Sequence, residues 1–366
     1  MRVKLEDVCE RGSSNLKQSD IIDATGDYPI YGASGYIGNV DFYHQDKPYV
    51  AVVKDGAGIG RTTLHPAKSS VIGTMQYLLP KENVLPEYLC YVVRYMHLEK
   101  YFTGATIPHI YFKDYKNEQF NLDSLERQAE IVDILGKCER VIASREDELQ
   151  KLDELIKARF VEMFGDPESN SKNWPVYKLS DLCNVGSSKR IYQEEQTADG
   201  IPFWRISDLV NKMDTGSADS GLYISQDKYN ELIKNDQVPV AGDILVTSRG
   251  TLGRCYIISD TDKFYFQDGM ISWLSKYKTG ITPLYIKYLF MTSGLIRQIN
   301  GMQAGSTVAY LSIGMLKKLN IMLPDLEAQN NFADFVYQVD KSKVVVQKAL
   351  DETQTLFDSL MQEYFG

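Results

Sequence analysis

Apolar residues recur with alternating spacings of four and three in two stretches of the chain. The first pattern runs from Ile131 to Met163 and the second from Phe332 to Tyr364, and eight of the ten positions in each are apolar. This spacing is typical of the seam of a coiled coil. It predicts helices over roughly 123–164 and 325–365, each about 60 Å long at the standard rise. Because helices of this length need an apolar partner, we expect the two to pack against each other.

The two seams belong to an internal duplication. A shift of 201 residues aligns 104–165 with 305–366 without a gap and gives 13 identities in 62 positions, among them Gln128 with Gln329. Similarity upstream of these segments needs different offsets. The chain therefore reads as two copies of one unit. Since each copy carries its globular part before its helix, we expect an antiparallel helix pair with the globular parts at opposite ends.

Each copy begins with a mixed globular part. Strands are expected near 49–53 and 243–247, and helices near 87–100 and 284–298. The sequence predicts an α+β fold in which two mixed α/β domains are separated by the two antiparallel helices, with an internal pseudo-twofold repeat. The expected boundaries are 1–121 for the first domain, 122–165 for the central helix, 166–322 for the second domain and 323–366 for the C-terminal helix.

The charge distribution modifies this description. The chain carries a net charge of −9, and residues 121–165 and 326–366 carry −4 each. The globular parts are therefore near neutral and free to present basic faces. We found no apolar run of membrane-spanning length, no apolar core of a signal peptide at the start, and no Cys-x-x-Cys pair among five scattered cysteines. We expect a cytoplasmic protein with no membrane contact and with buried free thiols.

Motifs for catalysis or cofactor binding are missing. The run 301–307 resembles a phosphate loop but lacks its lysine, and the glycine run 56–60 is interpreted as a turn. The sequence contains neither the Asn/Asp-Pro-Pro-Tyr/Phe element of amino-methyltransferases nor a nuclease-type acidic cluster, and its four histidines all lie in the first copy. We predict no catalytic residue, no bound cofactor and no metal site in this chain.

Both copies place basic residues beside a glycine turn. An arginine on a tight loop can bond a guanine edge bidentately or hold a phosphate. Nearby amide and aromatic side chains, including Tyr31, Tyr36, Tyr43 and Trp204, can add base or sugar contacts. The candidate DNA-binding residues are Lys54, Arg61, Gln76, Arg205, Arg249, Arg254 and Gln267.

Several junctions resemble a known family. Residues 104–110 followed by 122–128 are similar to the passage from a target-recognition domain into a conserved helix in type I restriction-modification specificity subunits. Residues 323–329 resemble that family's Leu-Pro-x-Leu-x-x-Gln pattern, and 163–175 resemble its passage into the second recognition domain. In one departure, Asp123 stands where the family usually has proline.

The resemblance implies a non-catalytic function. Specificity subunits hold two target-recognition domains, each reading one half of a bipartite site in double-stranded DNA. Two modification subunits dock on the helices, carry S-adenosylmethionine and methylate adenine, while restriction subunits join for ATP-dependent translocation and cleavage. The acidic helices would then face protein rather than phosphate.

Two other classes of function stay open at this point. A coiled-coil scaffold protein would show no sequence-selective DNA binding when its partners are present. A self-contained adenine methyltransferase would bind S-adenosylmethionine as an isolated chain. The enzyme would need a cofactor pocket and a catalytic motif that this sequence lacks, and in the scaffold the coiled coil would be the functional part.

Overall fold

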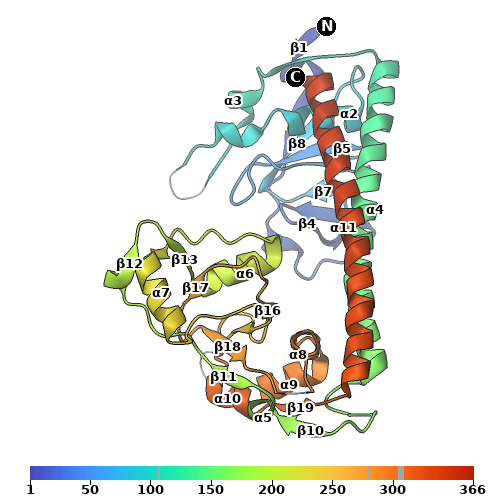
Figure 1. Cartoon of the computed structure of the whole chain (residues 1–366). Coiled ribbons are helices and arrows are strands. Elements are labelled where there is room, and N and C mark those ends of the chain that lie inside the picture. Colours follow the sequence, from blue (N-terminus) through green and yellow to red (C-terminus); the bar gives the residue numbers. More distant parts are fainter. Residues whose placement is uncertain (105–107, 279, 304–308) are drawn as a thin grey trace. The chain divides into compact units, whose positions relative to one another are not determined.

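The computed structural model describes residues 1–104, 108–278, 280–303 and 309–366 (Figure 1). Parts of the junction at 104–110 and of the glycine-containing run at 301–307 lie outside these residues. The chain forms two compact units. Unit 1 comprises residues 1–147 and 346–366, and unit 2 comprises residues 148–345. Both long helices pass from one unit into the other, so each unit contains half of each helix.

The two long helices are confirmed. Helix α4 spans Leu125–Phe164 and α11 spans Leu326–Phe365 (Figure 1). All twenty seam positions expected from the heptad spacing are buried or half-buried. In unit 1 the start of α4 and the end of α11 share one core, through Ile131, Leu135, Met361 and Phe365. In unit 2 the end of α4 and the start of α11 do the same, through Ile156, Phe160, Phe332 and Val336. The helices are therefore antiparallel within each unit.

Unit 1 contains a four-stranded antiparallel sheet of order β2-β8-β5-β6 and a three-stranded sheet of order β4-β3-β7, in which β3 and β7 are parallel. Strands β1 and β9 form a separate pair that precedes α4. The elements of this unit are β1 (Arg2–Lys4), α1 (Leu5–Val8), β2 (Cys9–Ser13), η1 (Gln18–Ile21), β3 (Tyr28–Gly32), β4 (Gly35–Val40), β5 (Tyr49–Val53), β6 (Thr62–His65), β7 (Ser70–Val71), β8 (Met75–Pro80), α2 (Pro86–Tyr95), η2 (Leu98–Tyr101), α3 (Phe112–Tyr115) and β9 (Gln119–Asn121).

Unit 2 repeats this plan with additions. Its antiparallel sheet has the order β11-β18-β15-β16, and its second sheet has the order β12-β14-β13-β17, with β13 and β17 parallel. The elements are β10 (Val176–Lys178), α5 (Leu179–Leu182), β11 (Asn184–Gly186), η3 (Gln193–Glu195), β12 (Gln196–Thr197), β13 (Ile201–Trp204), α6 (Ile206–Thr215), β14 (Tyr223–Ile224), α7 (Gln226–Lys234), β15 (Ile244–Thr247), β16 (Cys255–Ile257), β17 (Tyr265–Phe266), β18 (Ile271–Ser275), α8 (Pro283–Leu289), α9 (Ser293–Gly301), α10 (Ile313–Lys318) and β19 (Asn320–Met322).

The internal duplication is confirmed. Strands β9 and β19 and helices α4 and α11 are offset by 201 residues, and the antiparallel sheets β2-β8-β5-β6 and β11-β18-β15-β16 have equivalent strand orders. Unit 2 differs from unit 1 mainly by α6, α7 and β12. The protein is therefore an α+β fold of two mixed domains and a pair of long helices. The four domain boundaries expected from the sequence stay a prediction.

Each long helix is fastened to its globular part by a buried glutamine. Gln329 Oε1 accepts from Thr282 N at 2.9 Å and from Thr282 Oγ1 at 3.1 Å. Its Nε2 donates to the carbonyl oxygens of Gly280 and Pro324, both at 2.9 Å. Gln128, 201 residues earlier, is also buried and makes three such bonds. The glutamine shared by the two copies thus connects the helix start to the loop before α8 or α2.

The helix expected at 284–298 is interrupted. Helix α8 ends at Leu289 and α9 begins at Ser293. Thr292 caps α9, because its hydroxyl accepts from Leu295 N, and residues that favour caps offer the backbone an alternative to continuing a helix. The strands expected at 49–53 and 243–247 are present as β5 and β15.

The five cysteines are free thiols, and four of them are buried. Burial raises the pKa of the Cys9 and Cys183 thiols to about 12. Both groups are therefore neutral and unreactive at physiological pH. In the described part of the chain no helix has the length and apolar character needed to cross a membrane.

Candidate nucleic-acid interface

The candidate basic residues lie on equivalent loops of the two units. In unit 1, Val53 N donates to Arg61 O at 2.9 Å across the β5–β6 loop. In unit 2, Thr247 N donates to Arg254 O at 3.0 Å across the β15–β16 loop. Arg61 and Arg254 therefore occupy matching positions. The run 56–60 is a turn, as expected, and its three glycines all have positive φ.

A second backbone contact fixes the start of each loop. Ile110 N donates to Lys54 O at 2.9 Å, and Leu311 N, 201 residues later, donates to Ser248 O at 3.0 Å. Lys54 therefore matches Ser248. Arg249, which follows Ser248, therefore matches the residue after Lys54.

The residues at this next position carry opposite charges. Asp55 follows Lys54 in unit 1, and Asp55 Oδ1 lies 2.7 Å from Nδ1 of His109. In unit 2, the guanidinium carbon of Arg249 lies 5.3 Å from the centre of the Tyr310 ring. His109 and Tyr310 are themselves 201 residues apart. The same two positions of the repeat thus hold an acid–histidine pair in unit 1 and an arginine–aromatic pair in unit 2.

Arg249 lines an open hollow of about 580 Å³ in unit 2. Three of the candidates expected from the sequence meet there, namely Arg205, Arg249 and Gln267, together with Arg190 and Tyr310. Arg190 Nε lies 2.9 Å from Oδ2 of Asp268, which also lines the hollow. With three guanidinium groups and one carboxylate, the wall of this hollow is cationic.

Unit 1 has a smaller hollow, of about 300 Å³, at the corresponding place. Ile72 N donates to Tyr31 O at 2.9 Å in unit 1, and Gln267 N donates to Trp204 O at 2.9 Å in unit 2. Ile72 therefore matches Gln267. Arg205, which follows Trp204, matches the glycine that follows Tyr31. The hollow of unit 1 is lined by residues that include Gln18, Gly32, Ala33, Asp55, Arg61 and Ile72.

Gln76 and Arg254 lie elsewhere. Gln76 is 2% exposed, and its Nε2 donates to the hydroxyl of Tyr115 at 2.5 Å. It is an interior side chain of β8 and lines neither hollow. The two terminal nitrogens of Arg254 bond the carboxylate of Asp214 on α6, at 2.5 and 3.3 Å. Arg254 therefore already has an anionic partner.

Lys54 and Arg61 differ in their surroundings. Arg61 Nη1 donates to Ala33 O at 2.9 Å, which ties the β5–β6 loop to the β3–β4 turn. Lys54 Nζ lies 3.7 Å from Oδ2 of Asp55 and is not part of the hollow's wall. Arg61 is thus placed to act on a ligand in the hollow, and Lys54 at its rim.

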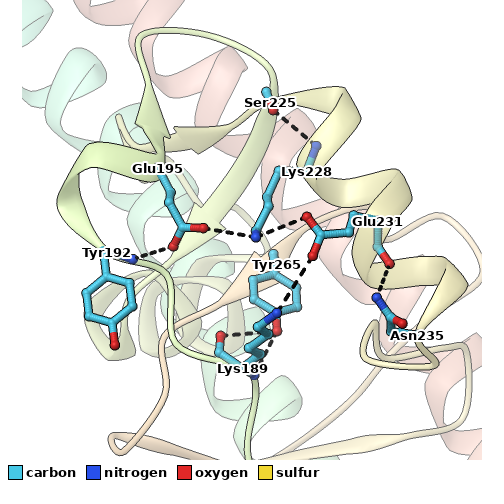
Figure 2. A network of polar contacts seen from close by, with 8 residues as sticks. All are labelled: Lys189, Tyr192, Glu195, Ser225, Lys228, Glu231, Asn235 and Tyr265. Atoms are coloured by element: carbon cyan, nitrogen blue, oxygen red, sulfur yellow. Dashed lines mark hydrogen bonds and ion pairs between the residues drawn. The ribbon is translucent and has the colours of Figure 1, made fainter.

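A polar network holds the segment that carries Arg190 (Figure 2). Lys228 Nζ of α7 lies 2.9 Å from a carboxylate oxygen of Glu195 and 3.2 Å from one of Glu231. Lys189 Nζ lies 3.7 Å from the other oxygen of Glu231. Since Lys189 and Glu195 flank Arg190 on one segment, these ion pairs fasten that side of the hollow to α7.

The charges in this network are stabilised by their neighbours. The backbone N–H of Tyr192 and the ammonium group of Lys228 lower the pKa of Glu195. The carboxylates of Glu195 and Glu231 raise the pKa of Lys228. Glu195 and Lys228 therefore remain charged at neutral pH, so the ion pair between them persists under physiological conditions.

The chemistry available at the two hollows is hydrogen bonding and charge. Within residues 1–104, 108–278, 280–303 and 309–366, no group of three or more His, Cys, Asp or Glu side chains is arranged to hold a metal ion. The sequence did not single out Arg190, Tyr310 or the pairing of Asp55 with His109. The signal for the pairing was the offset of 201, which sets His109 opposite Tyr310.

The comparisons with known proteins agree with one another. A family described as type I restriction modification DNA specificity domain matches residues 1–154 and 171–353. A putative type I restriction enzyme specificity subunit of Haemophilus influenzae is 25% identical over 320 residues, which is 85% of this chain and 80% of that protein. A type I restriction enzyme specificity subunit of Methanocaldococcus jannaschii is 23% identical and is covered over 77% of its length.

Solved structures share the fold. The S subunit of a type I restriction-modification system from M. genitalium has a TM-score of 0.59 and 14% identity, with 100% of this chain and 96% of that one covered. A chain from a structural study of complex assembly in the type I system has a TM-score of 0.56, also at 14% identity, with 97% of it covered.

Proposed function

Because the chain belongs to the family of type I restriction-modification DNA specificity domains, we propose that it reads double-stranded DNA for such a complex, one half of a bipartite target with each domain. The observation that carries this proposal is the pair of matched hollows. Each repeat builds the same backbone frame around its hollow, and the side chains on that frame differ. Two similar frames with different linings suit two different half-sites.

The unit 2 hollow has the groups that DNA reading requires. Arginine guanidinium groups bond guanine edges and phosphates, and glutamine bonds adenine. Arg205, Arg249 and Gln267 supply these donors in one hollow, and Arg190 adds a further cation. In unit 1, Arg61 and the rim residue Lys54 have the corresponding roles. We leave Gln76 out of the contact surface because it is buried.

The helices are the docking surfaces in this proposal. Each bears large apolar side chains on its exposed face, among them Leu155, Val161, Val344, Val345 and Leu356. Exposed apolar groups of this kind are typical of surfaces that bind protein. Two modification subunits dock there and hold S-adenosylmethionine, and restriction subunits complete the assembly. This chain supplies recognition and no catalytic residue.

Methylation mapping tests the proposal. Genomic DNA from cells with and without the gene is compared, and we expect adenine methylation at one bipartite sequence that disappears with the gene. The purified complex with its modification subunits is then assayed on duplexes varied one base pair at a time. Methylation without sequence preference would favour the scaffold function, and S-adenosylmethionine bound by the isolated chain would favour an enzyme.

A further inference from the structure

The matched residues Asp55 and Arg249, at the starts of the two loops, carry opposite charges and would therefore select different bases. We infer that Arg249 and Asp55 are the equivalent residues with which the two domains read a base edge. Arg249 donates to a guanine in the half-site of unit 2. Asp55 accepts from an exocyclic amino group, that of cytosine or adenine, in the half-site of unit 1. The inference rests on the proposed function and assigns residues to it.

Arg249 contacts an aromatic ring, and within the described residues its donors have no hydrogen-bond partner. Its guanidinium lies over the face of Tyr310, at 5.3 Å from the ring centre, and the side chain is exposed. Among the described residues it has no carboxylate partner within ion-pair distance. A guanidinium with a ring contact and without such a carboxylate keeps N–H donors for a ligand, and two of them match guanine O6 and N7.

The backbone around this pair is fixed. Ser248, immediately before Arg249, donates its N–H to Met270 O at 2.9 Å and accepts from Leu311 N at 3.0 Å. Tyr310 N donates to Oε1 of Gln303 at 2.9 Å. The arginine and its aromatic platform therefore start from anchored positions, which reduces the ordering that binding requires.

Two other arginines near this hollow, Arg190 and Arg254, are less suited to base reading. Arg254 bonds Asp214 through two nitrogens, and Arg190 bonds Asp268. Each would have to give up or share an anionic partner before it could bond a base. A guanidinium next to a carboxylate still attracts a phosphate by charge, so these residues fit backbone contacts better than base contacts.

Asp55 is held in a comparable way with the opposite charge. His109 lies 2.7 Å from its Oδ1 and Lys54 lies 3.7 Å from its Oδ2, and the carboxylate is about one-third exposed on the wall of the hollow. A carboxylate accepts about four hydrogen bonds, so these two partners leave lone pairs free. Acidic side chains read amino groups on base edges, because they can only accept.

The test is methylation by the complex with its modification subunits on duplexes varied one base pair at a time. For Arg249→Ala we expect about 5- to 150-fold less discrimination at a single guanine in one half-site. Asp55→Ala should have this effect at a single base pair of the other half-site. Arg249→Lys keeps the charge but not the paired donors, so it should also lose the guanine preference.

Base analogues identify the contacted atom. Replacing the guanine by 7-deazaguanine removes the N7 acceptor, which should slow methylation by the native complex and have no further effect on the Arg249→Ala complex. For Asp55, the matching probe is a base that lacks the exocyclic amino group. Tyr310→Phe keeps the ring and should behave as the native chain, whereas Tyr310→Leu should reproduce part of the Arg249→Ala profile.

Lys276→Ala is the matched control. Lys276 is an exposed cation of unit 2 that follows β18 at the end opposite the hollow, and it pairs with Asp236. Its base profile should equal that of the native complex. If the native complex discriminates in both half-sites while the Arg249 and Asp55 variants keep the full profile, the inference is overturned and the proposed function stands. If the native complex shows no base preference, the proposed function itself fails.

Discussion

At the scale of single residues, the buried glutamines at the starts of the long helices are sensitive positions. Replacing Gln329 by Leu keeps a similar volume but removes the partner of a buried carbonyl group and of a half-buried N–H and carbonyl group. Each unpaired buried group costs about 1–3 kcal/mol. We expect Gln329→Leu to lower the free energy of unfolding by at least about 3 kcal/mol, measured by urea denaturation. Gln347→Leu, at an exposed glutamine of α11 that bonds Asp351, is the control and should change it little.

His65 gives unit 1 a pH dependence. Burial lowers its pKa from 6.5 to about 4. The folded state therefore binds the proton less readily than the unfolded state. The contribution of neutral His65 to the free energy of unfolding is complete above pH 6.5 and is lost as the pH falls towards 4. Between pH 7.5 and 5 the loss should be about 2 kcal/mol in urea unfolding. His65→Phe, which keeps a ring against Tyr49, should remove most of this difference, and an unchanged difference would assign it to other groups.

The candidate residues show what sequence can say at this scale. Basic residues beside glycine turns were recognisable, and three second-domain candidates do meet in one hollow. Whether such a residue is free depends on partners that are distant in sequence. Arg254 bonds Asp214, 40 residues away, and Gln76 bonds Tyr115, 39 residues away. No local pattern carries that information, because helix α6 and the end of α3 reach these side chains only in the folded chain.

At the scale of elements, the helix seam can be tested with adjacent residues. Ile156 is 1% exposed in the core of unit 2, whereas its neighbour Leu155 is 47% exposed. Ile156→Asp buries a carboxylate without a partner and should cost several kcal/mol of unfolding free energy. Leu155→Asp should cost less than about 1 kcal/mol. Denaturant unfolding of both variants decides the matter, and similar losses would mean that the seam is misplaced.

The helices were predictable because their periodicity is local and long. All positions that the heptad spacing assigned to the seam are buried or half-buried. The spacing did not predict the burial of Phe160 and Phe164. Both side chains lie off the seam and are buried because α8 covers that side of α4, where Tyr285 contacts both rings. A globular domain that packs on a coiled coil widens the apolar face beyond the seam, and the spacing alone does not show where this happens.

At the scale of the whole molecule, the two domains should act independently. Arg61→Ala in unit 1 and Arg205→Ala in unit 2 change different hollows. Their effects on DNA binding by the complex should therefore add, with the double variant within about 0.5 kcal/mol of the sum. Binding is measured at fixed salt on one duplex that carries both half-sites. A coupling energy well above this value would mean that one domain senses the occupancy of the other.

The duplication was visible in sequence only where the offset is constant. From residue 104 onwards the shift of 201 holds, and it relates His109 to Tyr310. Upstream, α6 and α7 lengthen unit 2, and the β15–β16 loop is one residue shorter than its counterpart. The match of Asp55 with Arg249 therefore needed the backbone hydrogen bonds. Insertions in loops cost little stability, so recognition loops drift out of register while the strands that hold them do not.

The hydrogen bonds that match between the two hollows are made by main-chain atoms, whereas the residues that differ between their walls differ in their side chains. Substitution at the wall therefore leaves the frame intact, and the two copies within this chain already show the result. Gly32 in the wall of unit 1 matches Arg205 in the wall of unit 2, and Asp55 matches Arg249. In such a scaffold, the bonds that stabilise the fold are separate from the side chains that would select the DNA sequence. Under the proposed function, one or two substitutions in a wall would give the complex a new methylation pattern while the fold stays the same.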